Sequence, residues 1–301
     1  MLRRPVLAGV VVVLALLVPA TDVAVLAGRV GRLQVPTVSR TAGTWVVLGL
    51  DSRADLPAGA ATADFGTTSD VPGARADVVV VLRETPEGLT AISVPRDVVV
   101  GTSSGPSRLA LTWLQGPRSM VEGLCALGIP TGHLVTVDLA GFAAVVDAAG
   151  GIDVDVPEPV RDPMAGLDLP HAGRRHLDGA TALAFVRSRH PEHLRNGSWV
   201  PAAVDPDGRA LAVGILLRAL SAAAHRMPPD PVRLQSMAWV ASGALGVDSA
   251  TTLREVAGVS GARIDRTEVL PVGAPSGTTL ARLPTDATRA AVRAAGLSCT
   301  S

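Results

Sequence analysis

The sequence predicts an α/β domain in which helices flank a central mixed sheet, because strand-like apolar runs alternate with helical segments along the chain. Its 301 residues can bury one large core. Three of the apolar runs follow one another closely, at residues 45–50, 78–82 and 89–94, and are rich in Val, Leu and Ile. We therefore expect these three runs to be buried, neighbouring strands.

Charged residues lie at one end of each of these strands. Asp51 follows the first and Asp77 precedes the second, while Arg96 and Asp97 follow the third, which a Pro/Gly turn at 84–88 reverses. If the strands pair as an antiparallel meander, these charges meet at one edge of the sheet. Arg matches phosphate oxygens, and carboxylates are ligands that Mg²⁺ takes beside phosphates. The pattern favours a site for an anion that also holds a metal; the alternative is a set of ion pairs at strand ends.

The N-terminus has the features of a membrane segment. Arg3 and Arg4 precede an uncharged run at residues 5–20, which is typical of a signal peptide or a signal anchor. At about 1.5 Å per residue the run is about 24 Å long, somewhat short of a bilayer core of about 30 Å. We expect an uncleaved anchor over 1–28, with a cleaved signal as the alternative, then a polar linker over 29–43. The positive-inside rule places the domain that follows, over 44–298, outside the cytoplasm.

The composition argues against nucleic acid as a partner. The formal net charge is zero and the chain contains no lysine, so it lacks the basic field that nucleic acid binding needs. Two residue pairs leave alternatives open. Cys125 and Cys299 can form a disulfide in an oxidising compartment, or remain a buried thiol and a loose tail. His190 and His193 have the spacing of metal ligands, but no third ligand is evident.

Local signals predict the remaining elements. Asp138 and Asp178 are placed to cap helices, and Asp205 or Asp207 to cap a longer one. Helices are expected at 118–127, 139–149, 179–186, from the third cap to about 224, and at 231–245, 249–259 and 286–295. Further strands are expected at 134–137, 152–156 and 264–269, and long loops at 52–74, overhanging the charged edge, and at 157–173.

Taken together, these motifs resemble the LytR-CpsA-Psr family of cell-wall enzymes. The matching segments occur in order over about residues 44–220: Leu48 to Arg53, Arg75 to Asp77, Ser93 to Asp97, Asp147 to Ile152, Pro157 to Pro159, Asp162-Pro163, Gly173 to Gly179, and Ala182 to Arg189. The resemblance implies one membrane-anchored, extracytoplasmic phosphotransferase domain with an apolar pocket for a polyprenyl tail. Such enzymes take a glycan polymer from a polyprenyl-pyrophosphate carrier and join it to peptidoglycan through a phosphodiester.

The resemblance also assigns roles to individual residues. Asp51 and Asp77 match the carboxylates associated with Mg²⁺, and Asp97 matches an adjacent acid. The pyrophosphate-binding arginines are matched by Arg75, Arg96, Arg187 and Arg189, with Arg53 and Arg209 as further candidates. The catalytic set is then Arg75, Asp77, Arg96 and Asp97. Either Asp77 or Asp97 can accept the proton of the attacking sugar hydroxyl.

One segment departs from the family pattern. After Asp207-Gly208-Arg209, the family usually continues with an Arg-Gln-Gln-like run, whereas this chain has the apolar run 210–214. This departure motivates a lipid-binding protein without turnover as an alternative. A hydrolase of polyprenyl pyrophosphates with the same residues is a second alternative, which acceptor dependence would distinguish. A transcription regulator is disfavoured by the outward topology, the neutral charge and the lack of a recognisable helix-turn-helix.

Overall fold

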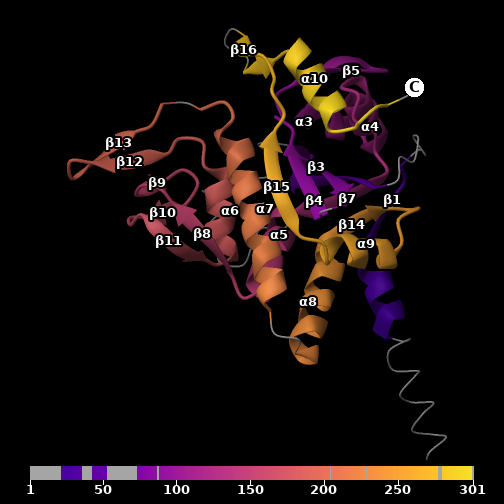
Figure 1. Ribbon diagram of the computed structural model, residues 1–301, viewed down its shortest axis with the longest axis horizontal. Coiled ribbons are helices and arrows are strands. Elements are labelled where there is room, and N and C mark those ends of the chain that lie inside the picture. Colours follow the sequence, from indigo (N-terminus) through magenta and orange to yellow (C-terminus); the bar gives the residue numbers. More distant parts are fainter. Residues whose placement is uncertain are drawn as a thin grey trace, which may run out of the picture.

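A seven-stranded mixed sheet lies at the centre of the fold (Figure 1). The computed structural model describes residues 22–35, 43–52, 73–86, 88–203, 205–227, 230–276 and 280–299. The strand order is β1 (Gly31–Leu33), β14 (Leu245–Asp248), β7 (His133–Asp138), β2 (Thr44–Asp51), β3 (Arg75–Thr85), β4 (Gly88–Ser93) and β15 (Ile264–Val269). The predicted meander is confirmed, because β3 pairs antiparallel with both β2 and β4. The predicted strand at 264–269 is also confirmed and extends the sheet in parallel beside β4.

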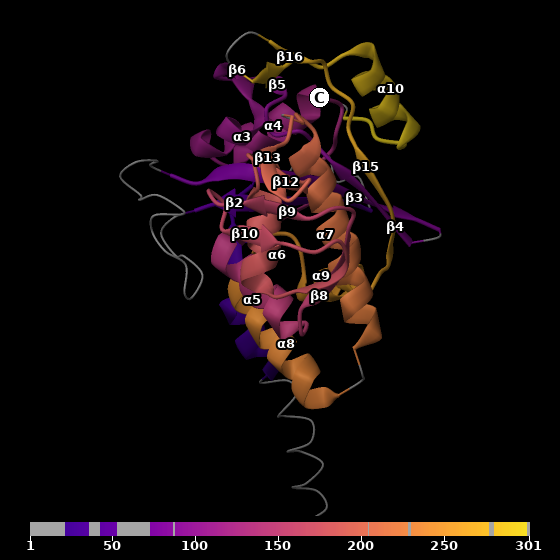
Figure 2. The ribbon, with the colours of Figure 1, turned by 90° about the vertical axis from the view of Figure 1, so that its left-hand side faces the viewer.

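Helices cover both faces of this sheet (Figure 2). One face carries α3 (Leu109–Thr112), α4 (Pro117–Ala126) and α10 (Asp286–Ala294), and the other carries α5 (Leu139–Ala148), α6 (Gly179–Arg187), α7 (Gly208–Arg226), α8 (Pro231–Ala244) and α9 (Leu253–Ser260). Alternate residues of the central strands face the two cores, as the period of two in a strand requires. Val79 and Val81 pack in the core with α4, whereas Val80 packs in the core with α7.

Smaller pieces complete the domain. Two strands, β8 (Ile152–Val156) and β11 (Gly173–Leu177), form a separate antiparallel pair, and β5 (Val99–Thr102) pairs with β6 (Gly105–Arg108) just before α3. A 3₁₀ turn, η1 (Trp113–Gln115), links α3 to α4. The last pair is β16 (Pro275–Ser276) with β17 (Ala281–Arg282).

The prediction of a long loop at 157–173 is wrong. This segment contains β9 (Val160–Asp162) and β10 (Leu167–Leu169), which pair with each other. They form a four-stranded sheet with β12 (Glu192–Arg195) and β13 (Ser198–Pro201). Each of these strands has only three or four residues, too few to show a period of two, so their pairing depends on tertiary partners.

The predicted helix caps are largely confirmed. The carboxylates of Asp138 and Asp178 accept hydrogen bonds from the backbone of Gly141 at 2.7 Å and of Thr181 at 2.8 Å. At the start of α7, Asp207 occupies the cap position without a capping bond from its side chain. The helix expected at 249–259 begins later, at Leu253, where Thr252 and Glu255 form a capping box. Because Thr252 is the cap, residues 249–251 of the expected helix lie outside α9.

The segment that precedes the sheet is only partly described. Residues 22–29, which overlap the end of the anchor expected over 1–28, are helical, and residues 1–21 lie outside the described part of the chain. Among the described residues, we find no helix of the length and apolar character needed to cross a bilayer. Strand β1 lies within the segment expected to be a linker, 29–43. The loop expected at 52–74 falls almost entirely on residues outside the description.

Of the two alternatives for the cysteines, the structure has the disulfide. Cys125 near the end of α4 is bonded to Cys299, which follows α10. The bond joins residues 174 positions apart and holds the C-terminal segment against the core that α4 shares with β3.

Candidate functional site

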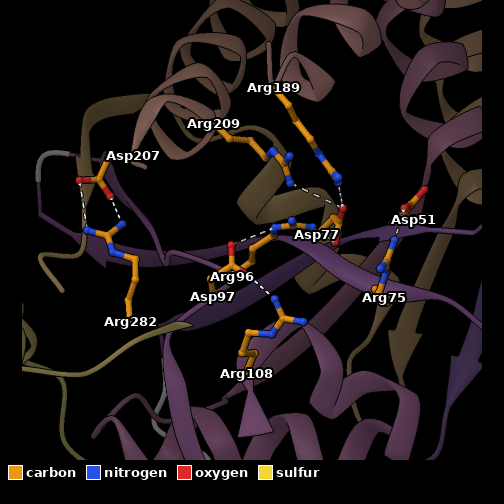
Figure 3. A network of polar contacts seen from close by, with 10 residues as sticks. All are labelled: Asp51, Arg75, Asp77, Arg96, Asp97, Arg108, Arg189, Asp207, Arg209 and Arg282. Atoms are coloured by element: carbon orange, nitrogen blue, oxygen red, sulfur yellow. Dashed lines mark hydrogen bonds and ion pairs between the residues drawn. The ribbon is translucent and has the colours of Figure 1, made fainter. Parts of the chain in front are cut away.

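Asp77, near the start of β3, lies at the centre of a group of arginines (Figure 3). Arg96 contacts one of its carboxylate oxygens at 2.5 Å, while Arg189 and Arg209 contact the other at 3.1 and 3.6 Å. Arg96 follows β4, Arg189 follows α6 and Arg209 is in the first turn of α7. The fold therefore brings three cations from distant parts of the sequence to one carboxylate.

A second ion pair lies at the same sheet edge, between neighbouring strands. Asp51 at the end of β2 is directly opposite Arg75 at the start of β3, and their side chains are 3.3 Å apart. The Nε atom of Arg75 is buried and has no hydrogen-bond partner among the residues that the structure describes. A buried donor without a partner is costly. This arrangement indicates a guanidinium that is oriented to donate to an additional acceptor.

Asp97 lies on the far side of Arg96 from Asp77 (Figure 3). Its carboxylate is 3.4 Å from Arg96 and 3.2 Å from Arg108. Arg108 was not among the residues predicted from sequence; it ends β6, and only the β5–β6 hairpin returns it to this edge. The charged edge therefore holds alternating aspartates and arginines.

Burial and charge shift the pKa values of this cluster. Burial alone would raise the pKa of Asp77, but the positive charges of Arg96, Arg209 and Arg189 outweigh it and hold the pKa below its usual value. Burial, then repulsion from Arg96 and Arg189, lowers the pKa of Arg209 to about 10. The pKa of Arg189 is lowered by burial foremost, and then by repulsion from Arg96 and Arg75. The cations of this cluster thus repel one another, and its aspartates do not fully offset burial and this repulsion.

Asp162 fixes the position of Arg189 through hydrogen bonds to the backbone. It is buried, and one of its oxygens accepts hydrogen bonds from the backbone amides of Arg189 and His190 at 2.7 and 2.8 Å and from the hydroxyl of Ser188 at 2.9 Å. These bonds outweigh burial and lower the pKa of Asp162. The sequence showed Asp162-Pro163 as a motif but gave no sign of this role, because the bonds join segments 26 to 28 residues apart.

An apolar cavity of about 300 Å³ opens beside the cluster. Strands β2 and β3 form its floor, and apolar side chains of α5, α6 and α7 form its walls, among them Phe142, Leu183 and Leu216. Asp51, Asp77 and Arg209 also line it. A second cavity of about 740 Å³ is lined by Arg96, Asp97 and Arg282 and shares Asp77, Arg189 and Arg209 with the first. The charged cluster therefore lies between two cavities.

The structure places the predicted site residues as follows. It brings together Asp51, Arg75, Asp77, Arg96, Asp97, Arg189 and Arg209. Arg187 lines the apolar cavity, and Arg53 lies outside the described residues. Arg282, which sequence reasoning missed, is buried and pairs with Asp207 at 2.5 Å, and so connects β17 to the start of α7, next to Arg209.

The carboxylates of Asp51 and Asp77 fit a magnesium ion that also binds phosphate. Both line the apolar cavity at its charged end, and Mg²⁺ is commonly held by one or two carboxylates plus phosphate oxygens. Within the described ranges, no group of three or more His, Cys, Asp or Glu side chains is placed to hold a metal alone. This also leaves His190 and His193 without a third such ligand in those ranges. The pair of aspartates suits a metal that arrives with an anionic substrate.

Comparison with known proteins gives consistent matches. The LytR_cpsA_psr family model matches residues 33–198. The probable cell wall biosynthesis protein LcpB of Corynebacterium glutamicum is 35% identical over 167 residues, 54% of this chain and 40% of LcpB. TagV of Bacillus subtilis, a polyisoprenyl-teichoic acid–peptidoglycan teichoic acid transferase, is 33% identical over 130 residues, 38% of this chain and 32% of TagV. The chain thus matches less than half the length of these curated relatives.

Solved structures extend the likeness beyond the matched family region. The LytR-Csp2A-Psr enzyme from Actinomyces oris is 35% identical with a TM-score of 0.73, covering 90% of this chain and 97% of that one. TagT bound to LI-WTA shares the fold, with a TM-score of 0.59 at 17% identity over 86% of this chain and 91% of that one. The family model covers more than half of the chain, and a solved member covers most of it: the chain belongs to the LytR-CpsA-Psr family.

Proposed function

We propose that this protein transfers a glycan polymer from a polyprenyl-pyrophosphate carrier to peptidoglycan and forms a phosphodiester link. The observation that carries the proposal is the position of the Asp77 cluster at the end of an apolar cavity. A polyprenyl pyrophosphate has the matching form, an apolar chain that ends in two phosphates. The names of TagV and of the related TagU proteins, transferases of teichoic acid to peptidoglycan, support the reaction class.

The arginines bind and orient the pyrophosphate. Arg96, Arg189 and Arg209 all contact Asp77, and only Arg96 also contacts Asp97, so these three cations outnumber the carboxylates that they contact. A pyrophosphate would complete their pairing. Arg75 would donate through its Nε, for which the described part of the chain supplies no partner. Phosphoryl transfer depends mainly on positioning and charge stabilisation, and these cations supply both. Arg187 would contact the substrate from the wall of the apolar cavity.

The acceptor hydroxyl attacks the glycan-side phosphorus, and polyprenyl phosphate leaves. Asp77 is a poor proton acceptor because three arginines hold its pKa low. Asp97 lines the larger cavity and not the apolar one. Attacking and leaving oxygens lie roughly in line on opposite sides of the phosphorus. With the lipid in the apolar cavity, the acceptor enters from the side of Asp97, which we therefore assign as the base.

Mg²⁺ would be held by Asp51 and Asp77 together with phosphate oxygens. When bound, it would neutralise charge on the pyrophosphate. The protein would act at the outer face of the membrane, with residues 5–20 as its anchor. The apolar run 210–214, which replaces the family's polar one, has a packing role here: Val213 is buried and Gly214 lies close to Thr267 of β15. Arg209 still reaches Asp77, so we expect turnover and not lipid binding alone.

The test is a transfer reaction with the full chain in detergent. The substrates are a short polyprenyl-pyrophosphate glycan, Mg²⁺ and peptidoglycan fragments, and mass spectrometry measures the joined product. We expect product only when donor and acceptor are both present. Release of polyprenyl phosphate at the same rate without an acceptor would identify a hydrolase. Tight donor binding without either product would identify a lipid-binding protein.

A further inference from the structure

Helix α8 carries apolar side chains that the described residues of the domain leave largely exposed. Of its 14 residues, only Ser242 is fully buried. Val232 is 78% exposed, Leu234 51% and Trp239 45%. A helix that is packed on one side normally turns its apolar residues toward the core, so these residues indicate a surface with a partner outside the domain.

The helix at residues 22–29 extends this surface. It lies beside α8 in both ribbon views (Figures 1 and 2). The guanidinium of Arg29 lies 3.8 Å from the ring centre of Trp239 and donates to the hydroxyl of Ser242 at 3.2 Å, and Gln235 donates to Asp22 at 2.7 Å. Val23 and Val25 on this helix are 58% and 49% exposed. We call the exposed apolar residues of the two helices the α8 surface: Val23, Val25, Val232, Leu234 and Trp239.

The chain itself indicates what covers the α8 surface. The helical residues 22–29 follow closely on the uncharged run at residues 5–20, the apolar part of the anchor expected over 1–28. Any surface beside this helix is therefore held close to the bilayer. Exposed aliphatic side chains beside a Trp and an Arg are the composition of a segment that lies in the interface between headgroups and acyl chains.

The position of the apolar cavity also indicates that the bilayer lies on the side of the α8 surface. Its lining follows α7 from Arg209 at the charged end to Leu220, about 16 Å at 1.5 Å per residue. From Leu220, α7 continues toward its junction with α8 (Figure 1). The end of the cavity away from the charged cluster therefore lies toward the α8 surface, the direction from which a membrane lipid would enter.

We propose that the α8 surface rests in the outer interface of the bilayer, with Trp239 at the level of the lipid headgroups. This contact holds the domain in one orientation, with the distal end of the apolar cavity toward the membrane. It rests on the proposed anchor at residues 5–20, but it does not depend on the proposed transfer reaction.

Tryptophan fluorescence tests this contact without any measurement of turnover. The chain has four tryptophans. Trp45 is buried against His133, and Trp199 is on β13, in the part of the domain opposite α8 (Figure 1). The full chain is reconstituted into vesicles with phospholipids brominated near the headgroup end of the acyl chain, which quench nearby tryptophans. We expect quenching of the wild type, loss of most of it in Trp239→Phe, and no change in the matched control Trp199→Phe.

A second variant keeps the tryptophan and changes the surface. Val232→Asp with Leu234→Asp alters two exposed positions, so the fold is retained, as circular dichroism can verify. It should reduce quenching of Trp239. Flotation of the vesicles shows separately whether the anchor still binds the variant to the membrane. Either of two results would overturn the proposal. The first is equal quenching in the wild type and Trp239→Phe, and the second is a chain that has the mass of a dimer and in which the second copy shields Trp239 from the lipid.

Discussion

Replacing Arg209 by Met should stabilise the protein without its substrate and weaken its response to pyrophosphate. The reason is the low pKa of Arg209, about 10 and well below its ordinary value, caused by burial and by repulsion from Arg96 and Arg189. The folded pKa of this base lies below the unfolded one. The charged guanidinium therefore destabilises the folded state at every pH below about 10, and this cost declines only as the pH rises through that range.

The size of the effect follows from the shift. One pKa unit corresponds to about 1.4 kcal/mol, so the shift corresponds to about 3 kcal/mol at neutral pH. The side chain keeps 18% of its exposure, and its contact with Asp77 is lost in the variant. We therefore expect a gain of about 1–2 kcal/mol, or a few degrees in Tm for a domain of this size.

The assay is thermal unfolding of the full chain in detergent, with and without inorganic pyrophosphate. Pyrophosphate should stabilise the wild type and stabilise Arg209→Met much less. Arg118→Met is the matched control, since Arg118 is 74% exposed in its pair with Glu122. This control should change neither the Tm nor the stabilisation by pyrophosphate. The reasoning is refuted if Arg209→Met unfolds more easily than the wild type, or if it keeps the full response to pyrophosphate.

Three further changes test other parts of the site. Arg96→Ala should abolish transfer with little effect on Tm, whereas Arg118→Ala should keep transfer; activity in both would contradict the role of Arg96. Asp162→Asn leaves buried backbone amides with a weaker acceptor, so it should cost about 1–3 kcal/mol of stability and reduce donor affinity measured by titration calorimetry, because Arg189 loses its support. Cys125→Ser removes a bond across 174 positions and should lower the unfolding free energy in urea by about 2–5 kcal/mol, with unchanged stability as the contrary result.

Much of the charged edge could be predicted from sequence because it depends on strand order. Apolar runs with a charged residue at one end, joined by a tight turn, fix which ends meet. Asp51, Asp77 and Arg96 therefore lie together as the meander requires. The caps at Asp138 and Asp178 were equally local, since each side chain bonds the amide three residues later.

The remainder depends on contacts between distant segments. Arg108 reaches Asp97 only because β5 and β6 form a hairpin. Arg282 pairs with Asp207 across 75 positions, and no spacing in the sequence indicates this. The four-stranded sheet of β9, β10, β12 and β13 was missed for the same reason, because its strands are too short to carry a pattern of their own.

The central claim is that the transferred group is a phosphoryl group that carries the glycan, and the lipid product tests it most directly. Mass spectrometry of the lipid after one round of transfer by the full chain distinguishes the two bonds that can break. Attack on the glycan-side phosphorus leaves polyprenyl monophosphate and a joined product that contains one phosphorus, which is the result we predict. Polyprenyl pyrophosphate, with a joined product that lacks phosphorus, would mean attack on the sugar carbon and would contradict the assignment of the Arg96, Arg189 and Arg209 cluster to phosphoryl transfer.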